Sequence, residues 1–190
     1  MSTTRQLLAP LTYLRIKHDA KAKYDWWYPV LLTILSVVVY YLLPVRFFLT
    51  GSDGLLGQVQ ELIQLLIGFY ILALSIVATF DVPNLDVEMK GAAPTLKEPR
   101  REDGQIVTVR LTRRRYLSFL FGYLSLLSLV FFLMVMLVNI VHPSLAKSCS
   151  ASVAHVLRFV GVGVFGFLFW QMIVITLQGL FFLIDRIHRD

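Results

Sequence analysis

Four long runs of apolar residues dominate the chain, and polar segments separate them. The runs predict membrane-spanning helices at about residues 26–44, 59–80, 116–141 and 156–184. The 20 residues between Asp25 and Arg46 carry no charge, and about 20 apolar residues cross a ~30 Å hydrocarbon core. The connection at 45–57 is a short turn. The pattern therefore predicts an all-α polytopic membrane protein with four transmembrane helices in two antiparallel hairpins, 26–80 and 116–184.

The segment 81–115 lies between the two hairpins and has a different pattern. Apolar residues alternate with polar ones near both of its ends, at Leu85, Val87 and Met89 and at Val107, Val109 and Leu111. Two such stretches around a turn-rich segment predict a β-hairpin with a long tip. An isolated hairpin is marginal in water, so it needs support from the N-terminal segment, a neighbouring subunit or a partner. A partly ordered linker is the alternative interpretation.

The composition agrees with a membrane protein. Apolar residues make up 57% of the chain, charged residues 16%, and the mean hydropathy is +0.70. Soluble domains average about 45–50% apolar and about 25% charged residues. The charges cluster in residues 1–25, in the loop 81–115 and in the tail 185–190, because a charge at mid-membrane costs at least ~2.5–3.5 kcal/mol.

The distribution of basic residues predicts the orientation of the protein. Of the 18 Lys and Arg residues, the N-terminal segment holds five, the loop eight and the tail two, which gives 15. The other side has three, Arg46, Lys147 and Arg158. Basic residues are enriched on the cytoplasmic side. We therefore expect a multi-pass inner-membrane protein with both termini and the 81–115 loop in the cytoplasm.

The net charge of +6 is spread along the chain. The loop also contains six acidic residues, so its net charge is 8 − 6 = +2. Phosphate binding favours a denser basic patch, and direct nucleic-acid binding is therefore not expected. Residues 1–25 are not a signal peptide, because the first apolar run starts only near Trp26. They predict an amphipathic helix on the inner leaflet or, equally well, a basic flank that sets the topology.

Polar and small residues recur on one face of three of the spans. In span two they are Gly57, Glu61, Gln64, Gly68, Ser75 and Thr79; in span three Ser118, Gly122 and Ser125; in span four Gln171, Gln178 and Asp185. Gly166 of span four ends a glycine run that favours close helix packing. Polar groups in a membrane face protein or water, because lipid offers them no partner. These faces predict helix-packing seams within a bundle or, less well, the lining of a pore. The seam of span four is expected to meet that of span two.

Three charged residues fall near the outer ends of the spans: Arg46, Glu61 and Arg158. We hypothesise that Glu61 forms an ion pair with one of the two arginines at this rim.

The sequence offers little for catalysis or for cofactor binding. The spans contain no paired carboxylates and no Ser-His-Asp set, so an enzyme is not expected. His142 and His155 flank Cys149, but their spacing matches no standard zinc pattern. The GxGxxG run that ends at Gly166 follows no strand and is not a dinucleotide site. A transporter is disfavoured because no charge lies near mid-membrane. No cofactor or metal is predicted.

Two functions remain. The first is a membrane anchor or sensor that contacts lipid, self-associates through its seams and recruits a cytosolic protein through the loop, for which β-augmentation is a natural mode. The expected partner-binding residues are Leu85, Val87, Met89, Val107, Val109, Arg110, Leu111, Arg113 and Arg114. The alternative is an oligomeric channel or membrane-disrupting effector lined by Glu61, Gln64, Gln171 and Gln178.

In size and organisation, the chain resembles the small polytopic components of bacterial anti-phage systems, such as the four-span subunit of Kiwa. The resemblance lies in the 190-residue length and the four spans. It implies that the anchor would serve in antiviral defence.

Overall fold

The computed structural model describes residues 8–18, 20–42, 54–80, 85–88, 93–99, 105–148 and 150–187. Its helices are α2 (Tyr28–Leu42), α3 (Leu55–Thr79), α4 (Arg113–Ser148) and α5 (Ala151–Ile187). A π-helical turn, η2 (Lys23–Trp27), leads directly into α2. Within the described residues, four segments are long and apolar enough to cross a membrane, Lys23–Leu42, Leu55–Thr79, Arg113–Val141 and Val156–Ile184. The four predicted spans are thus confirmed as helices of sufficient length.

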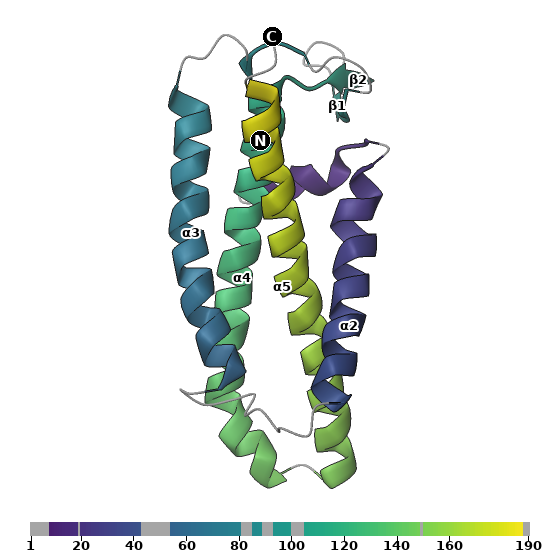
Figure 1. Ribbon diagram of the computed structural model, residues 1–190, viewed down its shortest axis with the longest axis vertical. Coiled ribbons are helices and arrows are strands. Elements are labelled where there is room, and N and C mark those ends of the chain that lie inside the picture. Colours follow the sequence, from purple (N-terminus) through teal and green to yellow (C-terminus); the bar gives the residue numbers. More distant parts are fainter. Residues whose placement is uncertain are drawn as a thin grey trace.

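The helices pack in the order α2–α5–α4–α3, and α2 and α3 lie on opposite sides of the bundle (Figure 1). The α4–α5 pair is in contact, as expected of consecutive spans. The other consecutive pair, α2 and α3, is not a packing unit, because α2 packs mainly against α5 and α3 against α4. Burial explains this: α3 turns Ile63, Tyr70 and Val77 inward towards α4, whereas Thr33 of α2 packs against Gly166 of α5.

A small sheet and the N-terminal segment share one end of the bundle, which we call the sheet end (Figure 1). Strands β1 (Thr95–Pro99) and β2 (Ile106–Arg110) are antiparallel, with Thr95 opposite Arg110. The short 3-10 helix η1 (Ala9–Arg15) packs against α4. The two-stranded hairpin is therefore confirmed, and it receives the support from the N-terminal segment that its marginal size requires.

The position predicted for the first strand was wrong. The alternation at 85–90 does not form it; within the described part of that stretch, only Glu88 makes a bridge, to Thr112. β1 lies further along the chain and buries only one apolar side chain, Leu96, which gave no period-two signal. The second strand lies within the predicted 106–112.

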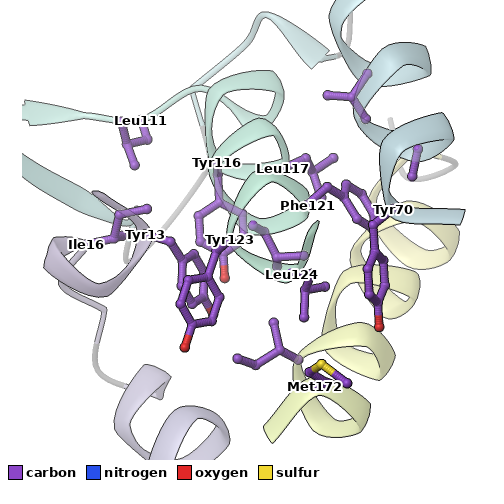
Figure 2. Packing of buried hydrophobic residues seen from close by; sticks show 14 of the residues in the cluster. Tyr13, Ile16, Tyr70, Leu111, Tyr116, Leu117, Phe121, Tyr123, Leu124 and Met172 are labelled. Atoms are coloured by element: carbon purple, nitrogen blue, oxygen red, sulfur yellow. The ribbon is translucent and has the colours of Figure 1, made fainter. Parts of the chain in front are cut away.

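The buried core continues from the sheet end into the helices (Figure 2). At the sheet end, Ile16 and Leu111 pack close to Tyr13 and Tyr116, which are also buried. Residues of the N-terminal segment therefore form part of the core. The prediction of a surface helix or a bare basic flank for residues 1–25 missed this, although Leu8, Leu11 and Leu14 of this segment remain exposed.

Candidate functional site

An ion pair is buried where the chain enters the first span. Lys21 Nζ donates a hydrogen bond to Asp25 Oδ2, and both side chains are almost fully buried. Tyr13 Oη donates to Asp25 Oδ1 at 3.0 Å, and Lys21 Nζ lies 4.1 Å from the centroid of the Tyr13 ring. Burial, together with nearby Tyr116 and Asp25, raises the pKa of Tyr13 above its ordinary value. The hydroxyl of Tyr13 therefore keeps its proton and remains a donor to the carboxylate.

This pair is tied to the helices by α5. Gln171 Nε2 donates to the backbone oxygen of Asp25 at 3.0 Å, and Tyr123 Oη donates to Gln171 Oε1 at 3.1 Å. The rings of Tyr13 and Tyr123 stack, with centroids 5.0 Å apart (Figure 2). We call Tyr13, Lys21, Asp25, Tyr123 and Gln171 the buried polar cluster. It fixes the N-terminal segment to α4 and α5.

Gln171 and Gln178, which the sequence assigns to the seam of span four, contact other parts of the chain than the polar face of span two. Gln171 is 3% exposed and belongs to the buried polar cluster. Gln178 Nε2 donates to Tyr116 Oη of α4 at 3.3 Å. α3 meets α5 through another residue, because the hydroxyls of Tyr70 and Thr176 are 2.7 Å apart. The two glutamines are used in packing within the chain.

Arg114 joins the end of α3 to the start of α4. Its Nε and Nη2 donate to the two carboxylate oxygens of Asp86 at 2.7 and 2.9 Å. Its Nη1 donates to the backbone oxygens of Val77 and Phe80, whose positions at the end of α3 leave them short of helical partners. The hydrogen bonds from Arg114 hold the pKa of Asp86 below its ordinary value. Arg114 is thus occupied within the chain.

β1 is held from both sides. Its neighbour β2 pairs along one edge, and on the other edge the backbone of Lys17 exchanges hydrogen bonds of 2.9 and 3.0 Å with Thr95. Arg115 Nη2 donates to both carboxylate oxygens of Glu98, at 2.6 and 2.8 Å. The sheet is therefore fastened both to the N-terminal segment and to α4.

The other edge of β2 is open within the described residues. The amide of Leu111 donates to Pro94 across from it, and the direction of backbone groups alternates along an antiparallel strand. The N–H and C=O groups of Ile106, Thr108 and Arg110 therefore point away from β1. Ile106 is 74% exposed and Val107 is 41% exposed. We call this the free edge of β2.

The predicted partner-binding residues divide into two groups. Leu85 and Leu111 are buried in the core, and Arg113 and Arg114 are half-buried. The exposed or half-exposed members are Val87, Val107, Val109 and Arg110. Met89 lies outside the described residues. The accessible part of the predicted surface is therefore centred on β2, and Ile106, which the alternation did not single out, is its most exposed apolar residue.

The polar face of α3 points away from the bundle. Glu61, Gln64, Gly68, Ser75 and Thr79 are exposed, and Gly57 is half-exposed. The buried residues of α3, including Ile63, Tyr70 and Val77, lie on the opposite side of the helix. The polar face of α3 therefore does not pack against another helix of the same chain. We call these six positions the outer stripe of α3.

The outer-rim ion pair is not found between Glu61 and Arg158, which are both exposed and unpaired among the described residues. α3 packs mainly on α4, and Glu61 lies on the face of α3 that points away from the bundle. Arg46 lies outside the described residues.

The small residues of the spans differ in how closely a neighbouring helix approaches them. A Cβ at Gly166 would lie 3.2 Å from Thr33 Cγ2, so this glycine allows α2 and α5 to approach closely. Gly179 has the same role against Leu120, at 3.0 Å, and was not predicted. A Cβ at Gly122 would meet nothing within 4 Å, and its neighbours Ser118 and Ser125 are half-exposed. The predicted face of span three is therefore not a tight seam within the chain.

The described residues contain no group of three or more His, Cys, Asp or Glu side chains that could hold a metal ion. The side chains of His142, Cys149 and His155 lie outside that description. Comparison with protein-family models, with curated proteins and with solved structures finds no match to this chain. The function must therefore be argued from the site itself.

Proposed function

We propose that this protein is a membrane anchor that self-associates and recruits a cytosolic protein on the free edge of β2. The proposal rests on this edge, where backbone groups that no described residue pairs lie beside the exposed side chains of Ile106 and Val107. Natural proteins usually cover or shorten such edges, because they pair readily with another strand. An extended segment of a partner would add to β2 by β-augmentation.

The contacts that attach the sheet to the rest of the protein support a role in docking a partner. The Arg115–Glu98 ion pair and the Lys17–Thr95 backbone pairing attach β1 to the rest of the sheet end. A docked strand would therefore be coupled directly to α4 and to the N-terminal segment. An anchor that also senses its membrane surroundings needs such a mechanical connection between the spans and the docking edge.

Orientation follows from charge. The segments 1–25, 81–115 and 185–190, whose described parts lie at the sheet end, hold 15 of the 18 Lys and Arg residues. The positive-inside rule therefore favours a cytoplasmic location for this end, in a bacterial inner membrane. The architectural resemblance to anti-phage components adds the proposal that the recruited protein acts in defence. The channel alternative loses support because Gln171 and Gln178 are committed to packing contacts.

The test uses a proline on the free edge. Thr108 directs its N–H outward, so Thr108→Pro removes one docking donor and leaves the β1–β2 ladder intact; Thr108→Val is the matched control. A photo-crosslinking amino acid at Ile106, in cells, should trap one cytosolic protein with the Thr108→Val form and none with Thr108→Pro. Trapping that is equal in both forms would contradict docking on this edge. Ion flux through liposomes containing the purified protein would instead favour the channel.

A further inference from the structure

The outer stripe of α3 is the one place where the described spans turn polar side chains away from their own bundle near mid-membrane. α3 has 25 residues, and Gln64 is only about 4–5 Å from its middle at 1.5 Å per residue. The hydroxyls of Ser75 and Thr79 are satisfied, because they donate to the backbone oxygens of Ile71 and Ser75. The carboxamide of Gln64 has no hydrogen-bond partner among the described residues.

An unpaired amide is costly in hydrocarbon, since lipid can neither donate to it nor accept from it. Several other polar side chains in the spans are paired within the chain: Trp170 Nε1 donates to Ser36 at 2.8 Å, and the hydroxyls of Tyr70 and Thr176 are 2.7 Å apart. Since no described residue pairs with it, we assign the partner of Gln64 to a group outside the protomer. Because a carboxamide both donates and accepts, the same residue of a second copy satisfies it across a two-fold axis.

The spacing of the stripe fits such a helix pair. With the exposed Ile71 added, the positions from Gly57 to Ser75 follow intervals of four and three, the heptad pattern of a left-handed helix pair. Gly68 lies at its centre, and a Cβ there would meet nothing within 4 Å in its own chain. Small residues at this position allow two helix backbones to approach. Glu61 lies six residues from the start of α3, nearer the helix end than Gln64.

We infer that the outer stripe of α3 is the surface on which two copies of this chain associate, with Gln64 hydrogen-bonded to Gln64 of the second copy and Gly68 at the closest approach. The inference rests on the membrane insertion and self-association proposed above and adds the surface. It does not involve the free edge of β2, which lies at the sheet end.

The decisive variants exploit two open glycines. Gly68→Leu and Gly122→Leu make the same change at positions that are both open within the chain, and they lie on α3 and α4 respectively. Self-association would be measured by energy transfer between labelled copies diluted into liposomes. We expect Gly68→Leu to abolish the transfer and Gly122→Leu to preserve it. Loss with Gly122→Leu alone, or no transfer with the wild-type chain, overturns the inference.

A second variant covers a folding defect in Gly68→Leu. Gln64→Leu removes the amide and should weaken association about threefold to tenfold, as interhelical hydrogen bonds in membranes do. Unchanged association with Gln64→Leu and Gly68→Leu also overturns the inference. Crosslinking of the cytosolic protein at Ile106 is a separate readout, so failure of partner docking is distinguished from failure of this surface.

Discussion

α5 and α3 carry similar polar patterns, but the fold treats them in opposite ways. Gln171 and Gln178 of α5 stand seven residues apart and point into the chain. Tyr123 and the backbone of Asp25 hydrogen-bond to Gln171, and Tyr116 accepts a hydrogen bond from the Nε2 of Gln178. Glu61 and Gln64 of α3 point outward. The polar face of α5 is thus used within the protomer, and we assign the polar face of α3 to a second copy. A polar face on a membrane helix therefore predicts that it has a partner, but not in which chain.

The largest loss of stability is expected from a substitution in the buried polar cluster. Asp25→Ala leaves the Lys21 ammonium buried without its carboxylate, and breaking a buried pair costs about 3–5 kcal/mol. The thermal midpoint of unfolding in detergent should fall markedly, and trypsin should cut the N-terminal segment faster. Lys23→Ala removes an exposed charge two residues away and is the control. Equal midpoints for the two variants would show that the cluster does not hold this segment.

A matched pair of glutamine substitutions sharpens the comparison directly. Gln171→Leu leaves the Tyr123 hydroxyl and the Asp25 carbonyl without partners, and we expect it to destabilise the protomer by about 1–3 kcal/mol. Gln64→Leu should leave the thermal midpoint of the dissociated protomer unchanged and should weaken only self-association. The comparison fails if the two variants have the same effect on protomer stability.

Two glycines of α5 test how tightly α5 packs against α2. Gly166→Leu forces a side chain against Thr33, and we expect overpacking to cost about 1–3 kcal/mol. Gly163→Leu is the control, because a Cβ there meets nothing within 4 Å. The melting midpoint should fall for Gly166→Leu and stay near the wild-type value for Gly163→Leu. A reversed order would mean that α2 and α5 do not approach at Gly166.

The smallest effect on stability is expected at Asp86, the exposed carboxylate bound by Arg114. Arg114 lowers the pKa of Asp86 below its ordinary value of 3.8, so the carboxylate stabilises the fold above that value. The contribution is lost as the pH falls through the lowered pKa. Wild type should therefore be slightly more stable than Asp86→Asn at pH 7, and the difference should vanish in strong acid. A difference that grows on acidification would contradict the assignment.

The sequence predicted the helices well and their neighbours poorly. The lengths of the spans follow from bilayer thickness, which acts on each run separately. Which face of α3 meets α4 depends on side-chain packing between distant segments, and the apolar residues of α3 surround most of the helix. The outward direction of Gln64 could therefore not be deduced from its spacing.

The sheet end was predicted in part. β2 contains four consecutive β-branched residues, Ile106 to Val109, which favour a strand. β1 contains Lys97, Glu98 and Pro99, whose places depend on Arg115 and on the N-terminal segment. The buried polar cluster had one local signal, since Lys21 and Asp25 are four residues apart and can pair on a helix. Their burial under Tyr13 required the fold. Among the predicted partner-binding residues, Leu85 and Leu111 were apolar because they belong to the core.

The most direct test of the central claim is a cysteine scan of α3 in native membranes. In a Cys149→Ser background, single cysteines at positions 61 to 76 would be oxidised and the yield of disulfide-linked dimers measured. Yield should peak at Glu61, Gln64, Gly68 and Ser75 and be low at Leu62, Phe69 and Ile76, which are exposed on another side of the helix. A peak on that other side, or equal yields at all positions, would contradict the assignment of the outer stripe to a second copy.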